Sequence, residues 1–193
     1  INLFSDVKEE FSLFDPKFLE EISKMKERNF AAELLRKLIA EQVRIYERTN
    51  AVRASKFSEI LANAMSNYLK GLLTNEEVIQ ELMKAAHDII NGEEDSKKLN
   101  LTSEELAFYD ALTKPEAVKD IYTNDQLVAI TKELTEALRE NKTIDWNVKE
   151  SARAGMRRIV KRLLKKYKYP PEGEEDALNT IMLQCNKWTE ENV

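Results

Sequence analysis

The stretch WNVKESARAGMRRIVKRLLKKYKYPP, residues 146–171, decides the fold predicted for this chain. With about 100° between successive residues of a helix, its apolar residues fall on a single stripe. The stripe consists of Val148, Ala152, Met156, Ile159, Val160, Leu163 and Tyr167. Asn147 followed by Glu150 matches a capping box at the start, and the pair Pro170-Pro171 ends the helix. The spacing therefore predicts one long amphipathic helix with Ile159 and Leu163 buried at its centre.

The other side of this predicted helix is strongly basic. From Lys149 to Lys168 there are nine basic residues and one acidic residue, a net charge of +8, whereas the whole chain carries −5 and the remainder therefore −13. Exposed helices usually alternate the signs of their charges and so form ion pairs, which this stretch does not do. The candidate docking or phosphate-contacting residues are Arg153, Arg157, Arg158, Lys161, Arg162 and Lys165.

Three interpretations of this basic side remain open at the level of sequence. It can be a solvated face, which is the usual fate of charged residues. It can dock onto an acidic surface, in this chain or in a neighbouring subunit. It can contact nucleic-acid phosphates, because Arg153, Arg157 and Lys161 recur one turn apart along one line. The acidity of the whole chain argues against a free-standing nucleic-acid-binding protein.

Composition indicates an all-α protein. The 193 residues include only four glycines and four prolines, and no stretch alternates in the manner of a β-strand. We expect a single helical domain over residues 1–193, an irregular multi-helix bundle with one or two long helices, which a polar loop can divide into halves at 1–90 and 101–193. One cysteine and no long apolar run predict a soluble protein of a reducing compartment, the cytoplasm. Because the chain begins at Ile1, we expect a fragment of a longer protein.

Local signals predict where the first helices begin and end. Asp15-Pro16 starts one helix, and Asn29 and Asn75 are caps for two more. Between Phe30 and Leu72 the apolar stripe fits either one very long helix or two that meet near Asn50. The polar, glycine-containing residues 91–100, NGEEDSKKLN, are predicted to form a loop.

The second half shows clearer capping signals. Thr102 with Glu105, and Thr123 with Gln126, are capping boxes, and Pro115 starts a short helix to Ile121. Residues 171–176 are predicted to form a turn. A last helix carries the apolar residues Leu178, Ile181, Met182, Cys185 and Trp188.

No catalytic or metal-binding constellation is visible in the sequence. The glycines are isolated, so no phosphate-cradling loop is expected. His87 is the single histidine and is predicted to be a partly exposed helix residue, and Cys185 a small core residue. Arg53, Lys56 and Glu59 fit a charged helix face.

Two aromatic features allow more than one interpretation. In LTSEELAFYDAL, residues 101–112, core packing is the plainer interpretation, although Tyr109 and Asp110 can instead present a polar tip to a partner. Trp146 and Trp188 are either core residues or anchors for a partner.

Three stretches together resemble the C-terminal helical region of type I restriction enzyme R (restriction) subunits. The first is the basic stretch with its I-D-W-x-x-K-E-S-A-R start, from Ile144 to Arg153. The others are LTSEELAFYDAL and the segment from Arg53 to Glu59 with the helix after it, and the three follow the family's order over nearly the whole chain. The resemblance covers none of the family's nuclease or ATP-binding motifs, so no catalytic residue, metal ligand or cofactor site carries over.

What the resemblance implies is a role in a larger enzyme. The parent subunit would be an ATP-dependent type I restriction endonuclease that uses ATP and Mg²⁺ to translocate and cut DNA. This chain would be its non-catalytic docking module, contacting the methyltransferase and specificity subunits. The alternatives are a helical domain that contacts the DNA backbone and steadies DNA beside the motor, and an internal brace on the subunit's own motor lobes. No membrane partner is expected.

Overall fold

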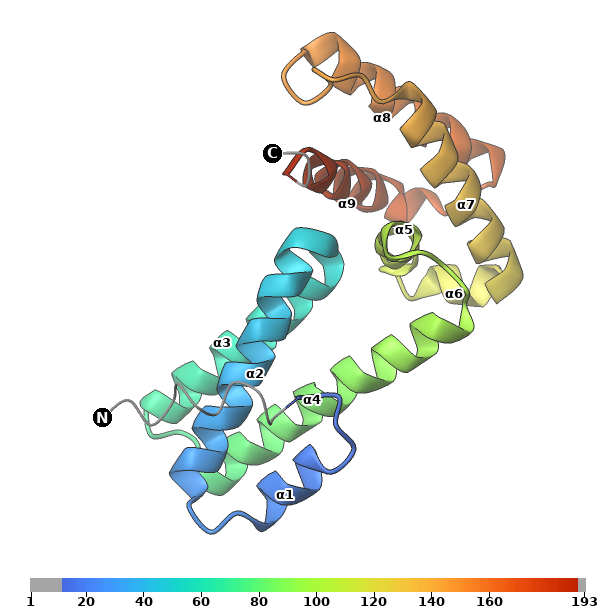
Figure 1. Ribbon diagram of the computed structural model, residues 1–193. Helices are drawn as coiled ribbons and strands as arrows, with labels where there is room; N and C mark the ends of the chain where they lie inside the picture. Colours follow the sequence, from blue (N-terminus) through green and yellow to red (C-terminus); the bar gives the residue numbers. More distant parts are fainter. Residues whose placement is uncertain (1–11, 191–193) are drawn as a thin grey trace. The chain divides into compact units, whose positions relative to one another are not determined.

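The computed structural model describes residues 12–190, with side chains up to residue 188, and every regular element in this part of the chain is an α-helix (Figure 1). The prediction of an all-α, irregular multi-helix bundle is confirmed. The helices of the described residues are α1 (Phe18–Lys24), α2 (Arg28–Thr49), α3 (Ala51–Leu69), α4 (Asn75–Lys98), α5 (Ser103–Thr113), α6 (Ala117–Ile121), α7 (Asn124–Asn141), α8 (Glu150–Lys166) and α9 (Pro171–Glu190).

The described residues form two compact units. The first comprises residues 12–45 and 55–98, and the second residues 46–54 and 99–190. The short segment Tyr46–Ala54, which holds the junction of α2 and α3, therefore belongs with the C-terminal helices. The expectation of one domain with halves at 1–90 and 101–193 stays a prediction.

Apolar faces of α1 to α4 build the core of the first unit. Phe18 and Ile22 of α1, Leu35 of α2, and Leu82 of α4 are almost completely excluded from solvent. At the surface of this unit, the Arg28 side chain bridges Glu76 at the start of α4 and the backbone carbonyl of Met25, 3.0 Å from Nη1. The first unit thus combines an apolar interior with polar ties between its helices.

The chain from residue 28 to residue 69 forms two helices, which resolves the alternative left open by the sequence. Asn50 interrupts them, and the chain reverses direction there (Figure 1). The Asn50 side-chain oxygen accepts a hydrogen bond from the Arg53 amide at 3.1 Å, as a helix cap does. Asn50 itself is 4% exposed, so the break lies in the interior.

Several predicted boundaries were wrong. Residues 91–98 are the last turns of α4 and not a loop: Ser96 is buried, and its hydroxyl donates to the Gly92 carbonyl at 2.6 Å. The helix ends instead at Lys98, and two residues later Asn100 has a φ of 54°, the left-handed conformation that asparagine tolerates just past a helix end.

The predicted first residue was also wrong for several helices. Residues 171–176 begin α9, because Pro171 occupies the first helical position and needs no amide partner there. Thr74 rather than Asn75 caps α4, and its hydroxyl accepts from the Glu77 amide at 3.2 Å. Asn29 lies inside α2, which begins at Arg28, and α1 begins at Phe18, two residues after Pro16.

The second unit is built from α5 to α9 around one apolar cluster. Helix α5 packs against α7 and α9, α7 packs against α8, and α8 packs against α9. The predicted inward residues of α7, Leu127, Ile130, Leu134 and Leu138, are all buried, as is the predicted stripe of α9 from Leu178 to Trp188. The Phe108 and Trp188 rings meet edge to face with centroids 5.2 Å apart.

Capping behaves as the sequence predicts at α7 and in part at α5. Thr123 and Gln126 form both hydrogen bonds of a capping box. At α5 the Thr102 hydroxyl accepts from the Glu105 amide at 3.2 Å, but the returning side-chain bond from Glu105 is not formed. These caps fix where α5 and α7 begin.

Candidate docking surface

Helix α8 carries the basic side predicted from the sequence, and its inner face is well buried. Met156, Val160, Leu163 and Leu164 lie in the core of the second unit. Ile159, predicted to be central, is only partly buried and packs at the edge of this core. The face opposite these residues is exposed to solvent.

The predicted start of this helix was wrong. Helix α8 begins at Glu150, and no side chain caps it. The preceding residues form tight turns because Trp146 is fully buried and draws the chain toward the core. Val148, assigned to the apolar stripe, is therefore outside the helix and 81% exposed. Trp146 and Trp188 are both core residues.

The end of α8 is a tight reversal that holds its last turn in place. The Tyr169 amide donates to the Leu164 carbonyl at 2.9 Å, and the Lys168 amide donates to the Lys165 carbonyl at 3.1 Å. This is a Schellman arrangement, with Lys168 at a φ of 55° in the position that glycine usually occupies. The buried Tyr169 hydroxyl donates to the Leu112 carbonyl at 2.6 Å and ties this end to α5.

Five of the six candidate basic residues are exposed. The sixth, Arg157, is half-buried, and its Nη2 donates to the Asn179 side chain of α9 at 3.3 Å. The predicted line of Arg153, Arg157 and Lys161 is therefore not a continuous exposed row, because its middle member leans on the neighbouring helix. The exposed residues of the set are Arg153, Arg158, Lys161, Arg162 and Lys165.

Four of these residues form the centre of the exposed face. Arg158, Lys161, Arg162 and Lys165 follow one another at spacings of three, one and three, which keeps them on one side of the helix, opposite Val160 and Met156. We call these four the basic cluster. Within the described residues none of the four forms an ion pair, and the Arg158 Nε donates only to the Ala154 carbonyl at 3.3 Å.

The neighbouring Lys166, on the same helix, does have an acidic partner. Its Nζ lies 2.6 Å from Glu133 of α7, and Tyr167 donates to the same carboxylate. These hydrogen bonds lower the pKa of Glu133, and the bond to Glu133 raises that of Lys166. No carboxylate plays this part for the basic cluster in the described chain.

A second polar group, around Arg53 and Asp110, serves the fold. The Arg53 Nε donates to Asp110 Oδ2 at 2.8 Å, and the Asn50 Nδ2 donates to the same oxygen at 2.7 Å. Arg53 was predicted to lie on a charged face, and Asp110, together with Tyr109, was a possible polar tip for a partner. The structure instead pairs them in the interior of the second unit, while Tyr109 is buried and Lys56 and Glu59 are exposed. The only sequence signal for this pairing is that both residues lie in stretches that resemble the same family.

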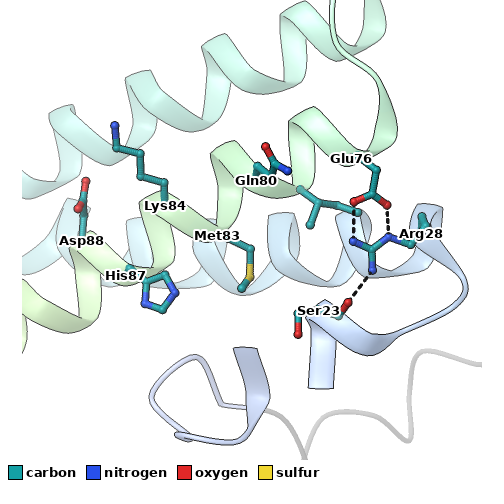
Figure 2. A pocket seen from close by; sticks show the side chains of 9 residues that line it. Ser23, Arg28, Glu76, Gln80, Met83, Lys84, His87 and Asp88 are labelled. Atoms are coloured by element: carbon teal, nitrogen blue, oxygen red, sulfur yellow. Dashed lines mark hydrogen bonds and ion pairs between the residues drawn. The ribbon is translucent and has the colours of Figure 1, made fainter. Parts of the chain in front are cut away.

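The first unit has a shallow groove of about 500 Å³ beside α4. Figure 2 shows Arg28 and Glu76 joined at one end and His87 at the other, on the exposed side of α4. His87 was predicted to be partly exposed and is exposed. No group of three or more possible metal ligands occurs among the described residues.

Two further observations concern reactivity and membranes. Cys185 is fully buried, as predicted, and burial raises the pKa of its thiol to about 12. In the part of the chain that the structure describes, no helix combines the length and apolar character needed to span a bilayer.

The comparisons with known proteins agree with the resemblance. The chain belongs to the family described as type I restriction enzyme HindI endonuclease subunit-like, C-terminal, whose model matches residues 1–191. It is the C-terminal domain of a type I restriction enzyme endonuclease subunit.

Two curated relatives carry that description in their names. The type I restriction enzyme HindI endonuclease subunit of Haemophilus influenzae is 35% identical over 182 residues, 94% of this chain and 17% of the relative. The putative type I restriction enzyme MjaIXP endonuclease subunit of Methanocaldococcus jannaschii is 31% identical over 160 residues, 82% of this chain and 15% of the relative. The chain thus spans about a sixth of the length of these relatives, and no solved structure matches it significantly.

Proposed function

We propose that this chain is a non-catalytic docking module, through which an ATP-dependent type I restriction endonuclease subunit assembles with its methyltransferase and specificity subunits. The observation that carries the proposal is the basic cluster on α8. Its four cations are exposed, lie on a helix whose other face is fixed in the core, and have no acidic partner among the described residues. A surface of this kind is complementary to an acidic face of another subunit.

The position of the cluster supports a rigid docking surface. The last turn of α8 is held by the Schellman hydrogen bonds, and the Tyr169 hydroxyl fastens it to α5. Because the backbone does not have to be ordered on binding, little conformational entropy opposes association. The half-buried Arg157 contributes to the fold through Asn179 and is not assigned to the docking surface.

The proposal assigns the chemistry to other parts of the subunit. ATP and Mg²⁺ would be bound outside this chain, and so would the nuclease carboxylates. The subunit's own motor lobes are expected neighbours of this module, and a membrane is not.

The test is assembly of the full-length subunit with its methyltransferase and specificity subunits. A variant with Arg158→Glu, Lys161→Glu, Arg162→Glu and Lys165→Glu should assemble at least about tenfold more weakly, since a complementary contact becomes repulsive. The matched control changes four exposed lysines on other helices and loops, with the same change of net charge. It carries Lys26→Glu, Lys70→Glu, Lys97→Glu and Lys132→Glu.

The second candidate function is contact with the DNA backbone beside the motor, and the uninterrupted positive charge of the cluster is the observation that favours it. In that case the same reversal would lower DNA affinity and leave assembly intact. The salt dependence of DNA binding would also reveal such contact, because each neutralised phosphate contributes about −0.9 to the slope of log affinity against log salt concentration. Normal assembly of the reversed variant would overturn the docking proposal.

A further inference from the structure

The turn that precedes α8 exposes two apolar side chains while burying a third. Ile144 is 97% exposed and Val148 is 81% exposed, whereas Trp146 between them is completely buried. Single exposed apolar residues are normal on protein surfaces. Two β-branched residues on either side of a buried tryptophan form a more specific pattern.

The geometry of the turn explains how both residues come to face outward. The Trp146 amide donates to the Thr143 carbonyl at 3.2 Å, and the Val148 and Lys149 amides both donate to the Asp145 carbonyl, at 3.1 and 2.9 Å. These bonds coil the chain with a nearly helical period, in which residues four apart share a side and the residue midway faces the opposite side. Trp146 therefore points inward and Ile144 and Val148 point outward.

The turn is also held in place from both sides. The Trp146 side chain packs in the core cluster of the second unit. The Lys149 ammonium forms an ion pair with Asp145 at 2.9 Å, across the base of the turn. Isoleucine and valine have few rotamers, so a partner would fix them at a small entropic cost.

We propose that Ile144 and Val148 are the apolar anchor of the docking surface and enter a shallow apolar pocket, rimmed by carboxylates, on the methyltransferase–specificity core. This inference rests on the proposed function and names the chemistry of the partner site. The basic cluster further along α8 argues for the acidic rim. Helix α8 starts directly after the turn, and its basic cluster begins at Arg158, about 12 Å further along at 1.5 Å per residue.

The apolar anchor and the basic cluster are expected to affect different rates of binding. Charged side chains at the rim of an interface steer encounter and raise the association rate. Apolar side chains at its centre exclude water and slow dissociation. The second unit presents both kinds of surface within consecutive residues, from Ile144 to Lys165.

The experiment measures the affinity of the full-length subunit for its methyltransferase–specificity complex, with association and dissociation rates, at low and at high salt. The variant with Ile144→Ser and Val148→Ser should bind at least about tenfold more weakly at both salt concentrations, through faster dissociation, since the apolar area buried is lost. The variant with Ile144→Val and Val148→Ile keeps that area and should bind as the parent does.

The matched control removes another exposed apolar pair. Leu69 and Leu72, on the turn between α3 and α4, are 80% and 68% exposed, and the variant with Leu69→Ser and Leu72→Ser should bind normally. Because all four side chains face solvent, the thermal unfolding of the variants should match the parent, which separates a binding effect from a folding effect.

The outcomes distinguish this inference from the proposed function. If the serine variant at Ile144 and Val148 binds within about twofold of the parent while reversal of the basic cluster still weakens assembly, the anchor is wrong and the docking function stands. Equal weakening by the control pair would also overturn the anchor. If neither the serine variant nor the charge reversal weakens assembly, the docking function falls and the anchor with it.

Discussion

The Arg53 guanidinium lies 2.8 Å from the Asp110 carboxylate, so that two stretches 57 residues apart in the chain are joined in the interior of the second unit. The two side chains are only 13% and 15% exposed. Asn50 donates to the same carboxylate oxygen, and the Arg53 guanidinium also lies over the Tyr46 ring at 5.9 Å. Burial alone would lower the pKa of Arg53, but the neighbouring Asp110 carboxylate contributes to a net rise in the pKa of the guanidinium.

Removing one partner of this pair should be costly. Asp110→Ala leaves a mostly buried guanidinium and the Asn50 amide without their acceptor, and we expect a loss of about 2–4 kcal/mol in the free energy of unfolding. Arg53→Met should cost less, because the methionine keeps the apolar part of the side chain. Urea unfolding of the second unit measures both.

A double-mutant cycle provides the control for that prediction. If the two groups interact directly, the double variant should lose clearly less stability than the sum of the single losses. Additive losses would show that the contact contributes nothing and that the single effects come from packing.

The buried face of α8 can be tested by comparing two leucines. Leu163 is 8% exposed and packs in the core, so Leu163→Ala should cost about 2–5 kcal/mol. Leu183 of α9 is 55% exposed, so Leu183→Ala should change stability by no more than about 0.5 kcal/mol. Equal effects in chemical denaturation would mean that α8 does not face the core as described.

Cys185 should be unreactive in the folded protein. Burial raises its pKa to about 12, so at pH 8 the thiol is protonated as well as inaccessible. We expect modification by a thiol reagent only when the second unit unfolds, at a rate that follows the concentration of denaturant.

The sign of the same shift predicts a pH effect. The folded pKa lies above the ordinary value of 9.0, so the unfolded chain releases this proton first. Stability contributed by the protonated thiol is therefore complete below pH 9 and declines as pH rises toward 12. Cys185→Ala should reduce this part of the decline, and an unchanged alkaline profile would contradict the assignment.

Lys168 offers a stabilising substitution. Its left-handed backbone conformation costs a residue other than glycine about 1–2 kcal/mol. Glycine avoids this cost, but its unfolded chain has more conformational entropy, which cancels part of the gain in stability. Lys168→Gly should therefore raise the free energy of unfolding by about 0.5–1 kcal/mol. Asn100→Gly is the matched control at a φ of 54°, and it should gain less, because asparagine tolerates this conformation.

The expressed chain should have neither ATPase nor nuclease activity. Its glycines are isolated in sequence, and the described residues contain no cluster of potential metal ligands. Phosphate release from ATP and nicking of plasmid DNA, each compared with a heat-inactivated sample, measure this. Turnover above that background would show a site that the sequence does not reveal.

The parts of the fold that the sequence predicted are those set by local chemistry. Thr123 and Gln126 form their capping box within a single helical turn, and no distant residue is needed. The inward face of α7 follows directly from the spacing of Leu127, Leu134 and Leu138.

The errors arose where distant packing overrides a local signal. The polar residues 91–98 include Gly92 and were predicted to form a loop. They are helical because α4 continues through them, with Ile89 and Ser96 buried on its inner side. Asn147 is a good cap in isolation, yet burial of Trp146 turns the chain before a helix can begin there.

The candidate surface was predicted only in part for the same reason. The residues of the basic side could be named from composition and spacing. Which of them are free could not, because the contact between Arg157 and Asn179 depends on where α9 packs. Exposure of Ile144 likewise depends on which way the tryptophan two residues later turns.

The junction of α2 and α3 has a consequence for the order in which the chain is made. The Thr49 carbonyl accepts from the Gln184 side chain at 3.0 Å, and the Ala51 amide donates to the same side chain at 2.8 Å. Two of the hydrogen bonds that stabilise the reversal at Asn50 thus involve a side chain more than 130 positions later in the chain. During synthesis the ribosome delivers Gln184 among the last residues of this sequence. We therefore expect the nascent chain to complete the hydrogen bonds of this reversal only when α9 emerges.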